Sequence, residues 1–228
     1  METFFILVEP SVPENIGASA RAIKTMGFNS LRMVKPEGYP DERANWLAHG
    51  SQEILEKALI FSSLSEAIED LDFVIGTSAK KRSVKFDYYP ISEVKDIIAK
   101  KEGNIRSLGL VFGKEESGLS NPELDLCDLI SYVPMAKPYP SLNLSQAVMV
   151  YAYQLADLSI NNQITGSSPS FKSHRQLKRK TELILERIGI PRSDAKFNRI
   201  IERFAMLNET DLNLVHSISN KLSSLLDS

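Results

Sequence analysis

Short apolar runs alternate with amphipathic stretches over the first 160 residues of the chain. The runs are rich in Val, Ile, Leu and Phe and are bounded by Pro, Gly, Ser or Asp, which is typical of buried parallel strands. They predict strands at 4–8, 31–34, 58–61, 73–77, 108–112 and 129–133. Apolar residues at helical spacing predict helices at 16–26, 64–70, 92–101 and 144–158. Such alternation is typical of an α/β layer fold with a mainly parallel sheet.

A polar stretch rich in Gly, Ser and Pro at 161–170 is the best candidate for a linker. Beyond it, apolar residues at helical spacing predict three helices, at 173–188, 193–207 and 209–226. We therefore expect an α/β domain over 1–160, a linker over 161–172 and an all-helical extension over 173–228.

The composition, with 43% hydrophobic and 25% charged residues, is ordinary for a globular protein and excludes collagen-like and wholly disordered classes. A single cysteine, Cys127, allows no intramolecular disulfide, so nothing indicates an oxidising compartment. The chain has no signal-peptide pattern at its start and no apolar run of about eighteen residues. These features predict a cytoplasmic protein that does not cross a membrane. Three scattered histidines and one cysteine form no zinc-binding spacing, so we expect no metal site.

The net charge of −2 conceals an uneven distribution along the chain. Residues 1–160 carry 16 Lys and Arg against 22 Asp and Glu, whereas residues 161–228 carry 11 against 7. A basic extension on a mildly acidic body is common in proteins that bind a polyanion. A set of solvated helix faces would explain the same charges, and charge alone favours neither interpretation.

Three segments contain residues that suggest chemistry, and the first is 9–21, directly after the first predicted strand. The end of a strand followed by a helix N-terminus is where α/β sheets place ligand groups. Asn15 suits a helix N-cap, and the small residues after it allow another backbone to approach closely. Arg21 lies within reach of an anion held near this loop. A cap and a surface arginine would explain the same residues without any function.

The second segment, 110–122, again runs from a strand into a loop, where Gly113 permits conformations that other residues resist. A solvent-exposed turn is an equally good interpretation of this loop. The third segment, 134–145, contains three prolines that stiffen it, and Ser141 and Asn143 lie at its exit. A stiff polar loop before a helix suits a bound small molecule. The chain has no G-x-G-x-x-G, P-loop or G-x-S-x-G pattern, which excludes the most common nucleotide and hydrolase signatures.

Taken in order, the three segments resemble the signature motifs of the SpoU/TrmH family of RNA ribose 2′-O-methyltransferases, in the SPOUT superfamily. They read N-x-G-x-x-x-R from Asn15 to Arg21, L-V-F-G-x-E-x-x-G-L from Leu110 to Leu119, and S-L-N-x-S-x-A from Ser141 to Ala147. The resemblance covers residues 4–157. It implies a SPOUT fold with a C-terminal trefoil knot, which pattern alone would never predict, and it implies a homodimer.

The resemblance also implies S-adenosylmethionine as the cofactor, held in the knot mainly by backbone groups. The residues that would line its site are Thr77, Ser78, Ala79, Gly113, Val133, Met135, Ser141, Leu142 and Asn143. Ser141 and Asn143 would in addition link the cofactor to the substrate and count among the catalytic residues.

The implied reaction moves a methyl group to a ribose 2′-hydroxyl, a poor nucleophile that must be oriented and must lose its proton. Arg21 would be the central catalytic residue. Because guanidinium groups stay protonated in proteins, orienting a phosphate suits Arg21 better than removing the proton. Asn15 would orient Arg21 and the ribose, and Glu116 would position groups in the site. Glu115 is taken to precede the motif position and is left out.

Binding of RNA requires local positive charge, and a net-acidic chain can provide it. The basic residues expected to contact RNA are Lys80, Lys81, Arg82, Lys85, Lys172, Arg175, Lys178, Arg179 and Lys180. A solubilising surface is the alternative role for these residues.

The basic helical extension further resembles the TrmJ subfamily of tRNA methyltransferases, which modify nucleotide 32 in the anticodon loop. The resemblance therefore implies a tRNA substrate. Methylation of ribosomal RNA is the nearest alternative, because the motifs do not encode the substrate. A non-catalytic RNA-binding module is a weaker alternative, since it would not need Asn15, Arg21, Glu116 and Asn143 together.

Overall fold

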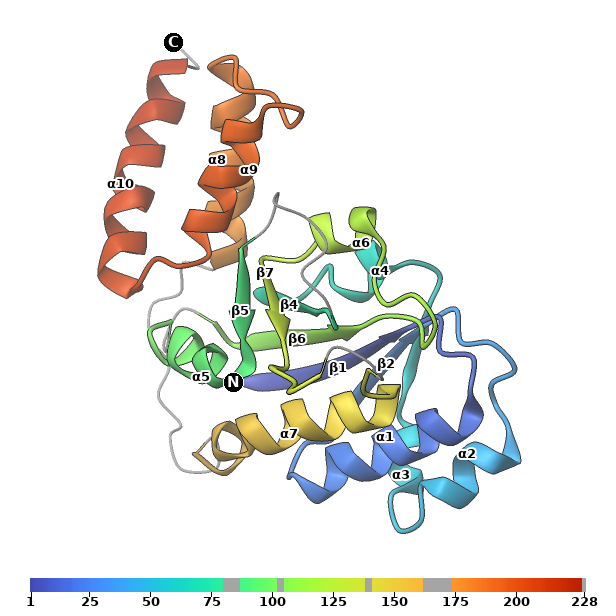
Figure 1. Cartoon of the computed structure of the whole chain (residues 1–228). Helices are drawn as coiled ribbons and strands as arrows, with labels where there is room; N and C mark the ends of the chain where they lie inside the picture. Colours follow the sequence, from blue (N-terminus) through green and yellow to red (C-terminus); the bar gives the residue numbers. More distant parts are fainter. Residues whose placement is uncertain (80–86, 102–104, 138–140, 162–173, 227–228) are drawn as a thin grey trace.

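The structure is a computed structural model that describes residues 1–79, 87–101, 105–137, 141–161 and 174–226 (Figure 1). At its centre is a sheet whose strand pairings are all parallel. The strands are β1 (Glu2–Val8), β2 (Ser30–Val34), β3 (Leu59–Phe61), β4 (Phe73–Thr77), β5 (Tyr88–Pro90), β6 (Ser107–Phe112) and β7 (Leu129–Tyr132). Their order across the sheet is β3-β2-β1-β6-β4-β7-β5. The predicted α/β fold with a mainly parallel sheet is confirmed.

The helices of the α/β part are α1 (Pro13–Thr25), α2 (Glu42–Leu47), α3 (Gln52–Glu56), α4 (Leu64–Ala67), α5 (Ile91–Ala99), α6 (Asn121–Asp125) and α7 (Leu144–Asn161). Those of the extension are α8 (His174–Arg187), α9 (Ala195–Phe204) and α10 (Glu209–Leu226). Among the residues that the structure describes, no helix combines the length and the apolar character that a membrane span requires.

Every strand and helix predicted from the sequence is present, with ends shifted by a few residues. The pattern missed β5, α2, α3 and α6, which are three to six residues long. A helix of five or six residues makes less than two turns, so no repeating apolar face develops. The edge strand β5 reads Tyr-Tyr-Pro and is defined only by its pairing with β7.

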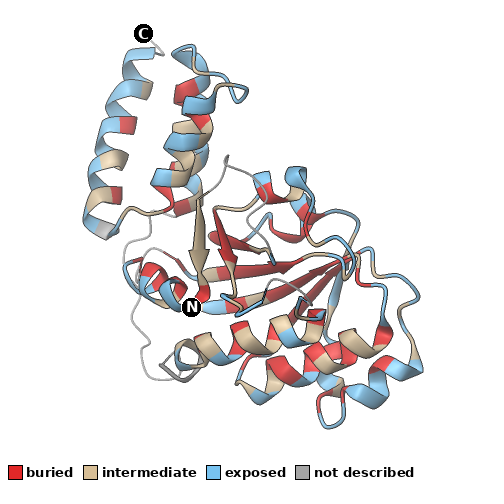
Figure 2. Cartoon of the chain, in the orientation of Figure 1, coloured by how far each residue is buried: buried red, intermediate tan, exposed pale blue. Residues whose placement is uncertain are grey.

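Helices cover both faces of the sheet, which explains why its central strands are apolar along their whole length. Phe5 and Leu7 of β1 point to one face and pack with α1, α5 and α7. Ile6 and Val8 point to the other face and pack with α4 and α6. Figure 2 shows the resulting pattern, with buried strands between helices whose outer sides are exposed.

Strand β7 lies between β4 and β5, so a strand from late in the chain is inserted between two earlier ones. Such an insertion is what the expected trefoil knot needs. The segments 80–86 and 138–140, on which the knot would depend, lie outside the described residues. The knot therefore stays a prediction, as do the linker and the exact limits of the two domains.

The extension lies at the end of the sheet where β5 and β7 begin (Figure 1). Its own small core consists of Leu177, Phe204 and Leu212. A core of this size buries little apolar surface, so contacts with the sheet are needed to hold the three helices in place.

One such contact is a buried ion pair between Lys178 of α8 and Asp128, the residue before β7. Only 17% of the Lys178 side chain and 8% of the Asp128 side chain are exposed. The second carboxylate oxygen of Asp128 accepts a hydrogen bond of 2.8 Å from the backbone nitrogen of Val74 in β4. Asp128 therefore joins the extension to two strands of the sheet.

Two further cations complete this junction. The Arg175 guanidinium donates to the carbonyl oxygens of Ile68 and Leu71, just beyond α4. In the opposite direction, the ammonium of Lys101 donates to the carbonyl oxygen of Leu207, at 3.1 Å. Lys101 is buried, and burial lowers the pKa of its ammonium to about 8. These hydrogen bonds are accepted by carbonyl oxygens near helix ends. Such oxygens have no partner within the helix and must be satisfied from outside it.

His174, the first residue of α8, lies buried between two aromatic rings at the same junction. The centroid of its ring is 5.2 Å from that of Phe73 and 5.4 Å from that of Phe204, in edge-to-face contacts. Burial lowers the pKa of His174 from 6.5 to about 4. The folded protein thus holds this imidazole in its neutral form at neutral pH.

We expect acid to weaken the folded state through His174. As the pH falls below 6.5, the unfolded chain binds a proton at this residue while the folded chain does not, until the pH approaches 4. Near pH 5 the lost stability is about 2 kcal/mol. Free energies of unfolding, measured with urea near pH 7.5 and near pH 5, should therefore fall more for the native protein than for His174→Phe. An equal loss in both proteins would contradict this role of the histidine.

Candidate active site

The first two motif segments meet because they follow neighbouring strands. β1 and β6 pair in parallel, so their carboxyl ends lie at the same edge of the sheet. There Glu9, just after β1, forms an ion pair with Lys114, just after β6. Parallel sheets commonly bind ligands at this edge.

The carboxylate of Glu115 binds the start of α1. It accepts hydrogen bonds from the backbone nitrogens of Ser11 and Val12, at 3.2 and 3.3 Å, and from the Ser11 hydroxyl, at 3.3 Å. The side-chain amide of Asn15 also donates to it, at 3.3 Å. A negative charge here stabilises the positive end of the helix dipole. The expectation that Asn15 is the N-cap is wrong: the helix begins at Pro13, after Val12, and Asn15 lies within the first turn.

The structure brings Asn15 together with Glu115, whereas the sequence interpretation had chosen Glu116. Glu116 is exposed and makes none of the contacts that join the two loops. Counting along L-V-F-G-x-E from Leu110 places the glutamate at 115, so the sequence already contained the signal. Glu115 is therefore the residue of this pair that the site geometry supports.

Glycines allow the two loops to turn and pack tightly. A Cβ atom on Gly113 would lie 2.2 Å from the carbonyl carbon of Gly118, and Gly118 itself has a φ of +67°. A Cβ atom on Gly17 would lie 2.0 Å from the carbonyl oxygen of Ala44, so only glycine lets α2 pack this closely on α1. The expected close backbone approach along this part of α1 is confirmed.

Arg21 lies almost two turns beyond Asn15 on α1 and is exposed. It takes no part in the hydrogen bonds between Asn15 and Glu115. The structure thus places the predicted catalytic arginine on the surface of α1, the helix whose first turn is bound by Glu115.

Most of the residues expected to hold the cofactor line one pocket. Its walls come from the carboxyl ends of β4 and β7 and from the start of α7. Six predicted residues line it, and Ala147 and Tyr151 join them: Thr77, Ser78, Ala79, Val133, Met135, Leu142, Ala147 and Tyr151. Ala147 is the last position of the third motif but had no role assigned to it, and the sequence gave no reason to assign Tyr151 to a site.

Hydrogen bonds at the base of this pocket join the three elements that form it. The Thr77 hydroxyl donates to the carbonyl oxygen of Val111, at 2.9 Å. The backbone nitrogen of Ser78 donates to the carbonyl oxygen of Ser131, at 2.9 Å. The hydroxyl of the buried Tyr151 donates to the Ser131 hydroxyl, also at 2.9 Å. These hydrogen bonds therefore hold the carboxyl ends of β4 and β7 in place.

Three other predicted cofactor residues do not line this pocket. Gly113 forms the tight turn described above, and Ser141 is exposed. Asn143 caps α7: its side-chain oxygen Oδ1 accepts from the backbone nitrogen of Gln146 at 2.7 Å, and its backbone nitrogen donates to the side-chain oxygen of Gln146 at 3.1 Å. The structure gives Asn143 a clear capping function, whereas its proposed contact with a ligand stays a prediction.

The expected RNA-binding residues fall into three groups. Five of them lie outside the described residues: Lys80, Lys81, Arg82, Lys85 and Lys172. Arg175 and Lys178 are bound to groups of the sheet in the junction, so a contact of either residue with RNA stays a prediction. Arg179 is exposed, and the ammonium of Lys180 donates to the side-chain oxygen of Asn220, at 2.6 Å.

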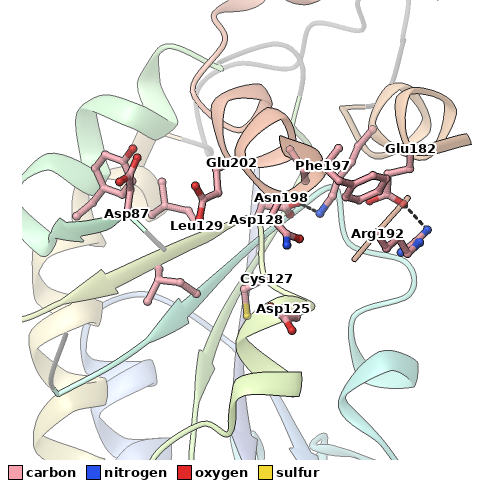
Figure 3. Close-up of a pocket in the computed structure, with 14 residues that line it drawn as sticks. Asp87, Asp125, Cys127, Asp128, Leu129, Glu182, Arg192, Phe197, Asn198 and Glu202 are labelled. Carbon is pink, nitrogen blue, oxygen red and sulfur yellow. Dashed lines mark hydrogen bonds and ion pairs between the residues drawn. The ribbon is translucent and has the colours of Figure 1, made fainter. Parts of the chain in front are cut away.

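A larger cavity, of about 220 Å³, lies between the amino ends of β5 and β7 and the helices α8 and α9 (Figure 3). Carboxylates predominate among its charged residues, with Asp87 and Asp128 from the sheet and Glu182 and Glu202 from the extension. It lies at the edge of the sheet opposite to the Asn15–Glu115 contact and the pocket of Thr77 and Tyr151. This cavity is therefore part of the junction and separate from the candidate active site.

Comparison with known protein families gives a match to the SpoU rRNA Methylase family over residues 2–153. A protein of Escherichia coli K12 named "Uncharacterized tRNA/rRNA methyltransferase LasT" is 37% identical over 220 residues, which cover 96% of each chain. The "tRNA (cytidine-2′-O-)-methyltransferase TrmJ" of Methanocaldococcus jannaschii is 33% identical over 95% of this chain and 89% of its own.

Solved structures give the same result over nearly the whole chain. A probable methylase family protein from Haemophilus influenzae has 30% identity and a TM-score of 0.64, with 99% of this chain and 97% of that chain covered. TrmJ from Zymomonas mobilis ("Z. mobilis ZM4") has 27% identity and a TM-score of 0.69, with 98% and 100% covered. Both similarities include the extension as well as the sheet.

We expect Glu115→Ala to lower the free energy of unfolding by about 1–2 kcal/mol, because the first turn of α1 and Asn15 lose their acceptor. Glu116→Ala is the matched control, and its effect should stay within about 0.5 kcal/mol. Urea denaturation of the three proteins measures both. If the two variants were equally stable, the contacts of Glu115 would not support the helix.

Proposed function

The chain belongs to the SpoU rRNA methylase family, and on that premise we propose that it transfers a methyl group from S-adenosylmethionine to a ribose 2′-hydroxyl of tRNA. The observation that carries the proposal is the pocket at the carboxyl ends of β4 and β7, where six residues that the family resemblance had assigned to the cofactor converge. The proposed target is nucleotide 32 of the anticodon loop. A tRNA substrate agrees with the name of the relative from Methanocaldococcus jannaschii, which matches 95% of this chain.

The residues of this pocket fit the cofactor. Val133, Met135, Leu142 and Ala147 provide apolar walls, and the strand ends at Ser78 and Ala79 provide backbone polar groups. An adenine ring requires this combination of apolar walls and a few placed polar groups. When bound, S-adenosylmethionine supplies a methyl group on a positively charged sulfur that a hydroxyl oxygen can attack.

The chain's own residues would orient the ribose and stabilise charge. Arg21 would bind a phosphate next to the target ribose through its fork of N–H donors. Asn15, held by Glu115 at 3.3 Å, would orient the ribose beside Arg21. The departing proton of the 2′-hydroxyl would pass to the substrate phosphate or to water, since guanidinium cannot accept it. Ser141 and Asn143 would contact substrate and cofactor from the start of α7.

We also propose that the protein acts as a homodimer in the cytoplasm. The exposed Tyr153 on α7 supports an interface on this side: 71% of this residue is exposed, and α7 packs directly on α1, which carries Arg21. Aromatic residues are enriched in the cores of protein–protein interfaces.

Ribosomal RNA is the second candidate substrate, because the relative from Escherichia coli is named as a tRNA/rRNA methyltransferase and covers this chain almost completely. The chemistry would be unchanged. A non-catalytic RNA-binding module is not supported by the family comparison, since the named relatives are methyltransferases.

We expect labelled S-adenosylmethionine to transfer its methyl group to unmodified tRNA, at a 2′-hydroxyl in the anticodon loop. Arg21→Ala should lower the rate by about a hundredfold or more, because it removes a group that acts on the reacting centre. Lys24→Ala is the matched control on the same helix, since Lys24 forms a surface ion pair with Glu53 at 2.9 Å. Its rate should equal that of the native protein.

Purified tRNA and ribosomal RNA pools, assayed separately, decide the substrate. Label on ribosomal RNA alone would overturn the tRNA proposal while keeping the reaction. Cofactor binding without transfer to either pool would overturn the proposed activity.

A further inference from the structure

The junction binds two of the basic residues that the sequence had assigned to RNA, whereas exposed cations lie on another helix of the extension. Arg175 and Lys178 on α8 are bound to groups of the sheet. Arg192, before α9, pairs with Glu182 at 3.0 Å and with Glu186 at 2.7 Å. We propose that the outer face of α9, formed by Lys196, Arg199 and Arg203, binds the phosphate backbone of the tRNA substrate. This inference rests on the proposed function.

The three cations lie on one side of α9 because they are spaced at i, i+3 and i+7. The opposite side carries Phe197 and Phe204, which are buried. The helix is thus held by its aromatic side, and its basic side faces solvent. Lys196, Arg199 and Arg203 are all exposed, with 54% of the Arg199 side chain and 61% of the Arg203 side chain accessible.

The length of this face suits a nucleic-acid strand. From the first to the last cation, the helix rises about 10 Å. One strand of a DNA duplex carries a phosphate about every 3.4 Å along its axis, and with this spacing as a guide for RNA about three phosphates span the same length. A row of cations with this spacing can neutralise neighbouring phosphates of one strand. A small anion would need only one or two of these cations.

The present partners of the two arginines leave them able to bind RNA. Both guanidinium groups approach one carboxylate, that of Asp87, at 3.3 Å from Arg199 and 3.7 Å from Arg203. Arg199 also lies 3.6 Å from Glu202. Exposed ion pairs at such distances contribute little to stability, and each guanidinium has five N–H donors, most of which remain for phosphates.

The position of α9 fits a long substrate. Asp87 directly precedes β5, at the edge of the sheet opposite to the candidate active site. A ligand that reaches both places must extend at least the length of a strand, about 10 Å for three residues. A tRNA does so easily.

The rival explanation is that Arg199 and Arg203 only hold the extension on Asp87. The two explanations differ in what the loss of Asp87 should do. If the arginines serve the junction, Asp87→Asn should weaken tRNA binding as much as loss of the arginines. If they bind phosphate, Asp87→Asn frees them and leaves tRNA affinity equal or higher.

The test measures the dissociation constant for unmodified tRNA at several salt concentrations, with the full chain. In the triple variant Lys196→Gln, Arg199→Gln, Arg203→Gln, we expect the constant to rise about tenfold or more near physiological salt, and the slope of log affinity against log salt to decrease by about 2–3. The rate at saturating tRNA and the affinity for S-adenosylmethionine should not change. Arg192→Gln is the matched control and should bind tRNA like the native protein.

Native affinity and salt dependence in the triple variant would overturn the inference. So would a loss in Asp87→Asn as large as that in the triple variant, because it would show a junction role. Failure of the native protein to methylate tRNA would instead overturn the proposed function. Methylation of tRNA with unchanged binding by the triple variant would overturn this inference alone.

Discussion

The buried carboxylate of Asp128 is the contact on which the arrangement of the whole molecule depends. Burial raises the pKa of this carboxyl, but Lys178 and the hydrogen bond from Val74 outweigh it, so its pKa lies below the ordinary value. A buried carboxylate without such partners would cost several kcal/mol. Because Val74 belongs to β4, Asp128 leads into β7 and Lys178 belongs to α8, one charged group determines how three elements meet.

The carboxyl ends and the amino ends of the strands consequently serve different functions. At the carboxyl edge, β4 and β7 end in the residues of the cofactor pocket, and the loops after β1 and β6 meet through Glu115 and Asn15. At the amino edge, the same strands β4 and β7 begin next to the extension. The extension is therefore attached to the strands that form the pocket. Its basic charge divides between buried cations that attach it and the exposed cations of α9.

The site shows where inference from sequence succeeds and where it fails. Residues that the family resemblance assigned to the cofactor, such as Thr77 and Val133, are in the pocket because the parallel strands β4 and β7 end at the same edge of the sheet. Tyr151 was missed as a site residue because its helix face reads as core in the sequence. Asn143 was assigned to a ligand, although its residue type equally serves to cap α7. Sequence patterns do not distinguish these roles.

The sequence by itself determined the fold class, the long helices and strands and the three motif segments, because periodicity and turn residues are local properties. Only the tertiary structure decided which charged side chains are held in the junction and which are exposed. Arg175, Lys178 and Arg203 look alike in the sequence, yet the first two are bound in the junction and the third is exposed. The tertiary structure also showed what Glu115 binds and defined β5, because these depend on contacts between segments far apart in the chain. Burial and pairing arise only when such segments meet.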